Sequence, residues 1–254
     1  MSEKELAVVD RFLERGGNMM ILADVGRQEV MNPLLHSLGV NILPGVIAQP
    51  SEINPGDLVL AKATQAAADK VGGFYKSMLR YKERSAVTMP SAVALEVTDT
   101  TRFHPTILLQ TDSLKTWIEY QTKDFVNESL SLDSLKGEKL GAYPTAIALT
   151  RKLKNQDKEQ RLIVLGDADC FSTAELQKSS RPGISSYNFT MIPGSFRWLC
   201  YGEFPVSSAR EPYLDNDISI TPMDLPLIKW VYCYGIPLVI GLCGVFIWLR
   251  RRKR

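Results

Sequence analysis

Acidic side chains and a cysteine directly follow the segment that is most clearly predicted to be a buried strand. Arg161–Leu165 is typical of a buried strand, and Asp167, Asp169 and Cys170 come immediately after it. Acids at the carboxyl end of a strand in a parallel sheet face the crevice in which α/β proteins bind ligands. Two aspartates one residue apart could hold a divalent cation together with substrate phosphates. The structural alternative is that both aspartates cap the following turn or helix.

Cys170 suggests a nucleophile, but its surroundings do not match a known arrangement. A nucleophile elbow has glycines two residues before and two residues after the nucleophile, whereas here Ala168 and Ser172 occupy these positions. The only histidines, His36 and His104, show no spacing that would make them its acid–base partner. A membrane-tethered hydrolase or transferase using the Asp167–Cys170 loop is therefore the alternative function.

Further polar residues follow other predicted strands. Asp24 comes just after the apolar segment Met19–Leu22. Thr111, Trp117 and Glu119 lie after another apolar segment, and an aromatic beside hydroxyls and an acid suits a partner or sugar surface. It suits a half-buried structural tryptophan equally well.

Several motif classes are missing from the sequence. The chain contains no GxxxxGK[ST], no GxGxxG, no CxxC and no HExxH, so it has no ATPase machinery of its own and we assign no cofactor or metal. The net charge is +2, and the last five residues are all basic, which leaves −3 on the remainder. A soluble part that is not basic argues against a nucleic-acid partner. Cys170 and Cys200 are expected to be buried free thiols, although the sequence also permits a disulfide between them.

The C-terminal region has the composition of a membrane anchor. Trp230–Leu249 is an uncharged run of 20 residues with aromatic residues at both ends, which is long enough to cross a bilayer core of about 30 Å. The arginine-rich residues 250–254 follow at once and predict a cytoplasmic tail, with the bulk of the chain on the other side of the membrane. The charged segment that begins at Met1 is not a secretory signal, and we expect an upstream part to lead export.

The elements expected before the anchor alternate between helix and strand. A helix over residues 6–13 is stopped by Gly16 and Gly17, and a second helix covers residues 28–38. This rhythm predicts a parallel α/β sheet. The expected strands are 19–22, 40–42, 58–61, 92–97, 106–110, 146–149 and 161–165. Residues 44–57 are expected to be a loop, residues 64–84 to be helical, and residues 189–201 to form a last helix.

These expectations define four regions. Residues 1–202 are an extracytoplasmic α/β region, with a mobile excursion or subdomain junction near 120–140. Residues 203–226 form a proline-rich stalk, 227–249 the transmembrane helix and 250–254 the basic tail.

Several strings taken in order resemble one family, the auxiliary extracytoplasmic subunits of ABC transporters of the gliding-motility (GldG-like) type. The strings are Phe12–Gly17 with Met19–Leu22 and Asp24, then Asn32–Leu35 with Gly39–Val40, Leu108–Thr111 with Trp117 and Glu119, Arg161–Asp169, Asn188 with Trp198–Leu199, and the arginine-ended anchor. Together they cover nearly the whole chain.

The resemblance implies a flavodoxin-like or class I amidotransferase-like parallel sheet without the amidotransferase nucleophile. It implies a non-catalytic accessory or substrate-binding subunit in the bacterial inner membrane, with a periplasmic domain beside a separate ABC permease and ATPase. It offers no catalytic residues. It also implies that the chain is the C-terminal portion of a longer protein. Asp24, Thr111, Trp117, Glu119, Asp167 and Asp169 are the candidate ligand or partner residues.

Overall fold

The computed structural model describes residues 1–122, 124–125, 127–128, 130–154, 157–178, 180–181, 183–205 and 225–252. The chain divides into two compact units, Met1–Val206 and Ser207–Arg254, which are described separately.

One mixed sheet organises the first unit. In the described part of the chain it has eight strands in the order β1-β10-β9-β7-β4-β5-β12-β11. Their bounds are β1 Met19–Leu22, β4 Leu58–Ala63, β5 Ser85–Pro90, β7 His104–Gln110, β9 Pro144–Arg151, β10 Gln160–Leu165, β11 Ser180–Arg181 and β12 Ile184–Ser186. The expected α/β class is confirmed. The expected parallel pairing is present at β1–β10 and β5–β12.

The other neighbouring strands of this sheet pair antiparallel. An all-parallel sheet is therefore corrected to a mixed one. The physical reason lies in the length of the connections. β9 ends at Arg151 and β10 begins at Gln160, whereas parallel neighbours need a crossover of a dozen or more residues.

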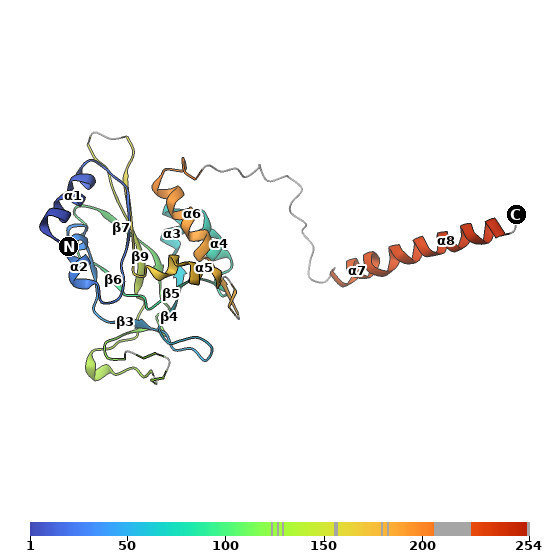
Figure 1. Cartoon of the computed structure of the whole chain (residues 1–254), viewed down its shortest axis with the longest axis horizontal. Helices are drawn as coiled ribbons and strands as arrows, with labels where there is room; N and C mark the ends of the chain where they lie inside the picture. The colour runs from blue at the N-terminus through green and yellow to red at the C-terminus, as the bar shows by residue number, and fades with distance from the viewer. Residues whose placement is uncertain are drawn as a thin grey trace. The chain divides into compact units, whose positions relative to one another are not determined.

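Helices cover both faces of this sheet (Figure 1). On one face lie α1 (Glu3–Glu14) and α2 (Gln28–Ser37), and on the other α3 (Gln65–Lys70), α4 (Phe74–Arg80), α5 (Thr173–Gln177) and α6 (Asn188–Leu199). Strand β10 shows why both faces must be covered. Leu162 and Val164 pack with α1 and α2 in one core cluster, whereas Ile163 and Leu165 pack with α3, α4 and α6 in the other. Successive side chains of a strand point to opposite faces, so a continuous apolar run is buried on both.

The ends of α1 are specified by local chemistry. Ser2 and Glu5 form a capping box, in which each side chain accepts a hydrogen bond from the backbone N–H of the other residue. Gly16, just beyond the helix, has a φ of 82°, a left-handed conformation that glycine adopts without strain. The expected glycine stop is confirmed.

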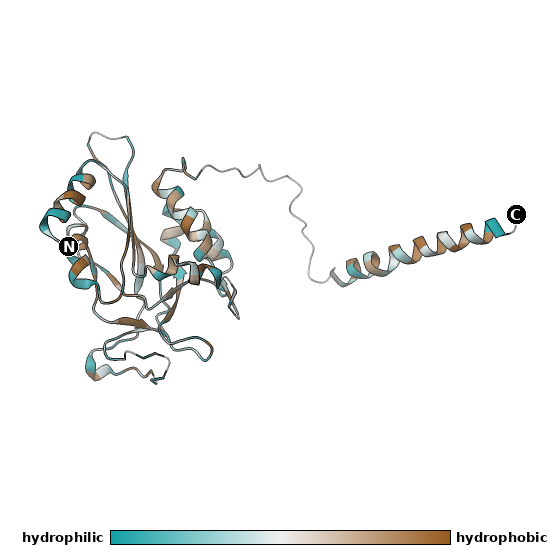
Figure 2. Cartoon of the chain, viewed as in Figure 1, coloured by the Kyte–Doolittle hydropathy of each residue, from teal (hydrophilic) through white to brown (hydrophobic). Residues whose placement is uncertain are grey.

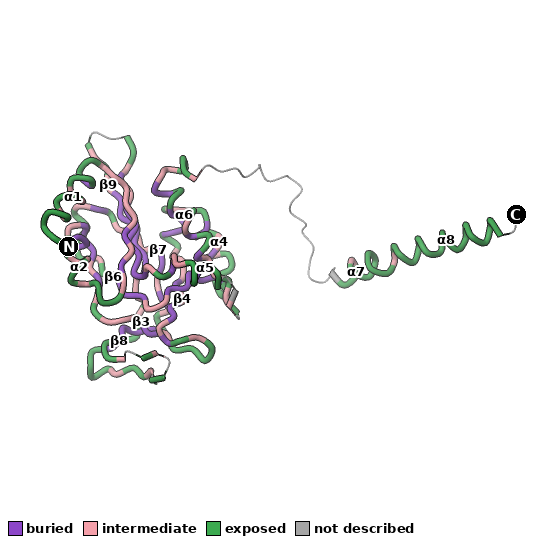
Figure 3. The backbone as a smooth tube through the Cα atoms, in the orientation of Figure 1, coloured by how far each residue is buried: buried purple, intermediate pink, exposed green. Residues whose placement is uncertain are grey.

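Two short ladders flank the main sheet, and they include strands that were not expected. β2 (Val40–Ile42) pairs antiparallel with β6 (Leu95–Val97). β3 (Val46–Ala48), in the segment expected to be a loop, pairs antiparallel with β8 (Trp117–Glu119). Strand β9 is buried along most of its length, while the segments around β3 and β8 mix buried and exposed residues (Figure 3).

The second unit contains an apolar helix. α7 (Leu225–Trp230), a π-helical turn (Val231–Gly235) and α8 (Ile236–Arg252) run without a break. The π-helical turn ends two residues before Pro237, whose ring cannot fit a regular α-helical turn before it.

Among the described residues, one helix, Pro226–Arg252, is long and apolar enough to span a membrane. Figure 2 shows hydrophobic residues along α8. The expected 227–249 helix lies inside this range. Residues 206–224 of the expected stalk and residues 253–254 of the expected tail lie outside the described part of the chain.

Candidate functional site

The parallel strands β1 and β10 end at the same edge of the sheet. Leu22 is in register with Leu165, and the N–H of Ala23 donates to the carbonyl of Leu165 at 2.7 Å. Asp24 and Asp167 therefore follow neighbouring strand ends, and the charge of Asp24 acts on Asp167. The fold thus places Asp24 and Asp167 at the same edge of the sheet.

Asp167 is the most perturbed acid of this edge. Its side chain is fully buried, Oδ1 accepts from the N–H of Asp169 at 2.8 Å, and no described residue donates to Oδ2. Burial raises the pKa of Asp167 to about 8, assisted by the charges of Asp169 and Asp24 and opposed by the N–H groups of Asp169 and Cys170. Asp167 is thus a neutral acid near pH 7 that caps its own turn, while Asp169 is exposed.

Cys170 is turned into the protein. Its thiol is fully buried and donates to the carbonyl of Asp167 at 3.1 Å. Burial, together with the charges of Asp167, Asp169 and Glu175, raises the pKa of this thiol well above its ordinary value. Nucleophilic cysteines instead have a depressed pKa and an accessible sulfur. All four cysteines are unpaired, and Cys200 is half-buried rather than fully buried.

A buried polar network next to this loop was not foreseen from the sequence. Asn188 at the start of α6 donates to the carbonyls of Thr88 and Cys170 at 2.7 and 2.9 Å, and it accepts from the N–H of Thr88 at 2.9 Å. Thr88 also donates to Glu175 Oε1 at 2.5 Å, and Arg181 Nη2 donates to Glu175 Oε2 at 3.0 Å. Burial would raise the pKa of Glu175, but Arg181 and Thr88 hold it below its usual value.

The loop after β7 and strand β8 keep three candidate residues inside the protein. Thr111 is 3% exposed, and its hydroxyl shares a 2.7 Å hydrogen bond with that of Thr116. Trp117 and Glu119 are each 5% exposed, and the indole Nε1 donates to Glu119 Oε2 at 3.2 Å. Trp117 and Glu119 are thus partners of one another, and the structure places neither on an open surface.

Glu119 organises the start of the 120–140 segment. Its Oε1 accepts from the N–H groups of Gln121 and Thr122 at 3.0 and 3.1 Å. Burial would raise the pKa of Glu119, but these N–H groups, the indole of Trp117 and a hydrogen bond with Glu138 hold it below its usual value. Glu138 is itself 2% exposed and accepts from the N–H of Asp133 at 2.7 Å. The two buried glutamates therefore fasten the two ends of this segment.

A wide groove with many polar lining residues lies beside β4 and β7. It has a volume of about 1260 Å³, and its lining includes Lys62, Thr64, Thr106, Gln110, Thr111 and Asp112. Lys62 Nζ donates to the carbonyl of Ser85 at 2.8 Å, and burial lowers its pKa against the opposing charge of Asp112. Of the six residues proposed from the sequence, this groove includes Thr111. Sequence reasoning did not identify the other lining residues of the groove, because β4 and β7 come together only in the folded protein.

The described residues include no group of three or more histidine, cysteine, aspartate or glutamate side chains placed to hold a metal ion. The acids of the β1–β10 edge instead interact with backbone N–H groups and with each other's charges. Their arrangement is that of a capped turn, which is the structural alternative stated for Asp167.

A protein-family model matches most of the chain. The match covers residues 1–193. The family is described as an ABC-type uncharacterized transport system, and its name designates an auxiliary component of such a system. No curated protein matches the chain. The matched range covers α1 to the first half of α6, which is nearly the whole of the first unit. The chain therefore belongs to this family of auxiliary components of ABC-type transport systems.

Proposed function

We propose that this protein is a membrane-anchored accessory subunit of an ABC transporter, with residues 1–202 outside the cytoplasm beside a separate permease and ATPase. The observation that carries the proposal is the family match over residues 1–193 in a chain that also has one helix, Pro226–Arg252, able to span a membrane. The chain has no phosphate-binding loop, so the energy of ATP must enter through another subunit.

The proposed orientation rests on charge. Arg250, Arg251 and Arg252 form the last turn of α8, and basic residues flanking a span stay on the cytoplasmic side. The first unit then lies in the periplasm, and the span lies in the bacterial inner membrane. The ordered strings shared with the gliding-motility type favour that branch of the family. Motility is here the name of the branch and not a proposed role of this protein.

A non-catalytic role is supported by the state of the buried polar groups. Cys170 is held as a buried thiol with a raised pKa, and Asp167 Oδ2 has no hydrogen-bond partner among the described residues that could share its proton. The polar groove beside β4 and β7 is the proposed place for a ligand, because hydroxyl and amide groups of Thr106 and Gln110 line it. In this proposal the subunit binds and presents a ligand and leaves its covalent bonds unchanged.

Affinity purification tests the partnership. The full tagged chain is extracted from native membranes in mild detergent, and copurifying proteins are identified and counted by mass spectrometry. A permease and an ABC ATPase in fixed ratio are expected. Recovery of folded chain without either protein would refute the accessory role.

Cysteine labelling tests the orientation. Leu135→Cys places a thiol at a side chain that is 99% exposed in the first unit, and Arg252→Cys places one at the end of the span. Both variants are made in a chain whose four native cysteines are replaced by serine. In intact spheroplasts a membrane-impermeant maleimide should label Leu135→Cys and spare Arg252→Cys, and permeabilisation should expose both. The reverse pattern would place the first unit in the cytoplasm.

A further inference from the structure

The sheet of the first unit ends in a strand whose outer side has no partner among the described strands. β1 is the first strand of the order and pairs there with β10 alone. The sequence Met19–Met20–Ile21–Leu22 contains no charge and no proline. Proteins usually protect exposed strand edges with such residues, with bulges or with a covering segment. An unprotected edge is therefore suited to pairing with a further strand.

The direction of the backbone groups identifies which of them are free. The N–H of Ala23 donates to the carbonyl of Leu165 and so points toward β10. Backbone groups of successive residues in a parallel strand alternate between its two sides. The N–H and C=O groups of Met20 and Leu22 therefore point away from β10, where no described strand meets them. They offer two donors and two acceptors along one line.

Apolar walls flank this edge on both sides. A groove of about 690 Å³ runs along β1 and is lined by Val8, Val9 and Phe12 of α1, by Asn18, Met19, Met20 and Leu22, and by Phe171 and Phe196. Val8 is 56%, Phe12 44% and Phe196 43% exposed. α1 and α6 cover opposite faces of the sheet. The groove therefore lies between the two helical layers, along the open edge of β1.

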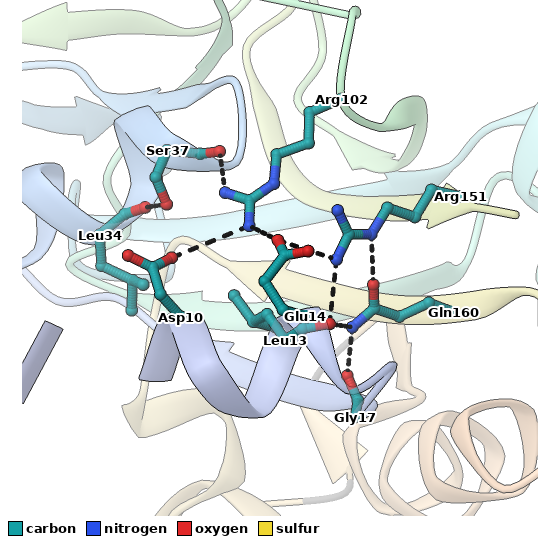
Figure 4. A network of polar contacts seen from close by, with 9 residues as sticks. All are labelled: Asp10, Leu13, Glu14, Gly17, Leu34, Ser37, Arg102, Arg151 and Gln160. Atoms are coloured by element: carbon teal, nitrogen blue, oxygen red, sulfur yellow. Dashed lines mark hydrogen bonds and ion pairs between the residues drawn. The ribbon is translucent and has the colours of Figure 1, made fainter. Parts of the chain in front are cut away.

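The wall formed by α1 is held rigidly. Figure 4 shows the side chains that fasten its C-terminal end to the sheet. Arg151 Nη2 and Gln160 Nε2 both donate to the carbonyl of Leu13 at 2.9 Å, and Gln160 also donates to the carbonyl of Gly17 at 2.6 Å. Arg102 Nη2 pairs with Glu14 at 2.7 Å. These bonds satisfy helix-end carbonyls and keep Phe12 and β1 at a fixed separation.

We propose that this groove binds one extended, uncharged apolar segment of a partner polypeptide, which adds to the sheet as a strand beside β1. The free N–H and C=O groups of Met20 and Leu22 require an extended backbone. The two apolar walls require apolar side chains on both faces of that backbone, as in any strand buried on two sides. A second copy fits less well, because self-pairing would set one groove against another and leave both unfilled. This inference is independent of the transport role.

A peptide with the sequence of β10 is a direct probe, because β1 already accepts that sequence on its inner side. The full chain in lipid nanodiscs is titrated with a fluorescent, end-capped peptide of residues 162–166, the uncharged part of this sequence, and binding is read by anisotropy. Two control peptides carry N-methyl groups on alternate amides in the two opposite phases. Strand pairing uses one edge of the peptide, so one phase should weaken binding more than tenfold and the other should leave it nearly unchanged. Equal binding of all three peptides would show apolar adsorption and overturn the proposal.

Matched variants locate the site on the protein. Val8→Lys and Phe196→Lys put charges into the groove walls, and each should weaken peptide binding about tenfold. Val30→Lys on α2 and Phe189→Lys on α6 change residues that are 43% and 71% exposed and lie outside the groove, and they should bind as the unmodified chain does. If the two groove variants and the two control variants lost the same peptide affinity, the proposal would be overturned. A dimer in the nanodisc that Val8→Lys dissociates would also overturn it, in favour of a second copy.

Discussion

Replacing Asp167 by asparagine should remove a pH-dependent destabilisation of the first unit. The pKa of Asp167 is raised from 3.8 to about 8 in the folded protein. Between about pH 4.5 and 7.5 the unfolded chain has lost this proton while the folded protein still holds it. The folded state then binds more protons than the unfolded state, so the free energy of unfolding falls as the pH rises.

The size of the effect follows from the shift. One proton held only by the folded state changes the free energy of unfolding by about 1.4 kcal/mol per pH unit, or by about 4 kcal/mol between pH 4.5 and 7.5. Asparagine keeps the oxygen that accepts from the N–H of Asp169 and has no charge at any pH. Asp167→Asn should therefore be about as stable as the unmodified chain at pH 4.5, and about 3 to 4 kcal/mol more stable at pH 7.5.

Urea unfolding of the full chain in nanodiscs, followed by circular dichroism at several pH values, measures this difference. Acids whose pKa is lowered on folding, such as Glu14 and Glu175, are present in both proteins and cancel. Asp169→Asn removes an exposed carboxylate from the same loop and serves as the control, with a much smaller gain. A difference between Asp167→Asn and the unmodified chain that does not change with pH would refute a buried neutral acid at this position.

Four further outcomes are expected. Asn188→Ala should lower the free energy of unfolding by about 2 to 4 kcal/mol, because it leaves buried partners of its amide unpaired; a loss in urea unfolding below about 0.5 kcal/mol would contradict this. The pKa of Glu119 is lowered on folding, so its stabilisation is present above its unfolded pKa and is lost as the pH falls; Glu119→Gln should be less stable than the unmodified chain at pH 7, with a gap that narrows toward pH 3. Cys170 should react with iodoacetamide at least 100-fold more slowly than Cys200 in the native protein, as mass spectrometry can measure. The full chain should stay in the pellet after alkaline carbonate extraction, whereas residues 1–205 alone should be released.

Sequence reasoning located the elements whose signals are local. Strands β1 and β10 contain short apolar runs next to glycine or polar residues, and β2 follows Gly39 with apolar residues on either side of Asn41. The helices α1 and α2 end just before glycines, as expected. Strand β5 was missed, because Ser85–Pro90 follows a polar, helix-prone stretch and has only three apolar residues among its six. β3 was missed because prolines surround it, and only its pairing with β8 makes it a strand.

The polar partnerships could not be predicted, because they join residues far apart in the sequence. Thr88 and Asn188 are 100 residues apart, and Thr88 and Glu175 are 87 apart. No spacing rule relates such positions before the chain is folded. The position of Asp24 and Asp167 directly after strands was predictable from the sequence, but the burial of Asp167 was not. An exposed acid and a buried neutral acid give the same sequence pattern.

Three buried acids of the first unit with perturbed pKa values, Glu119, Asp167 and Glu175, support an accessory role when their surroundings are compared. Asp167 is buried and neutral, Glu175 is paired with Arg181, and Glu119 accepts from backbone N–H groups and an indole. Perturbed pKa values often mark catalytic sites. Here each perturbed group has a partner or a protonation state that stabilises a particular turn, strand or segment end. A domain that uses its buried acids to fix its own loops has rigid surfaces for binding, which is what an auxiliary transport subunit requires.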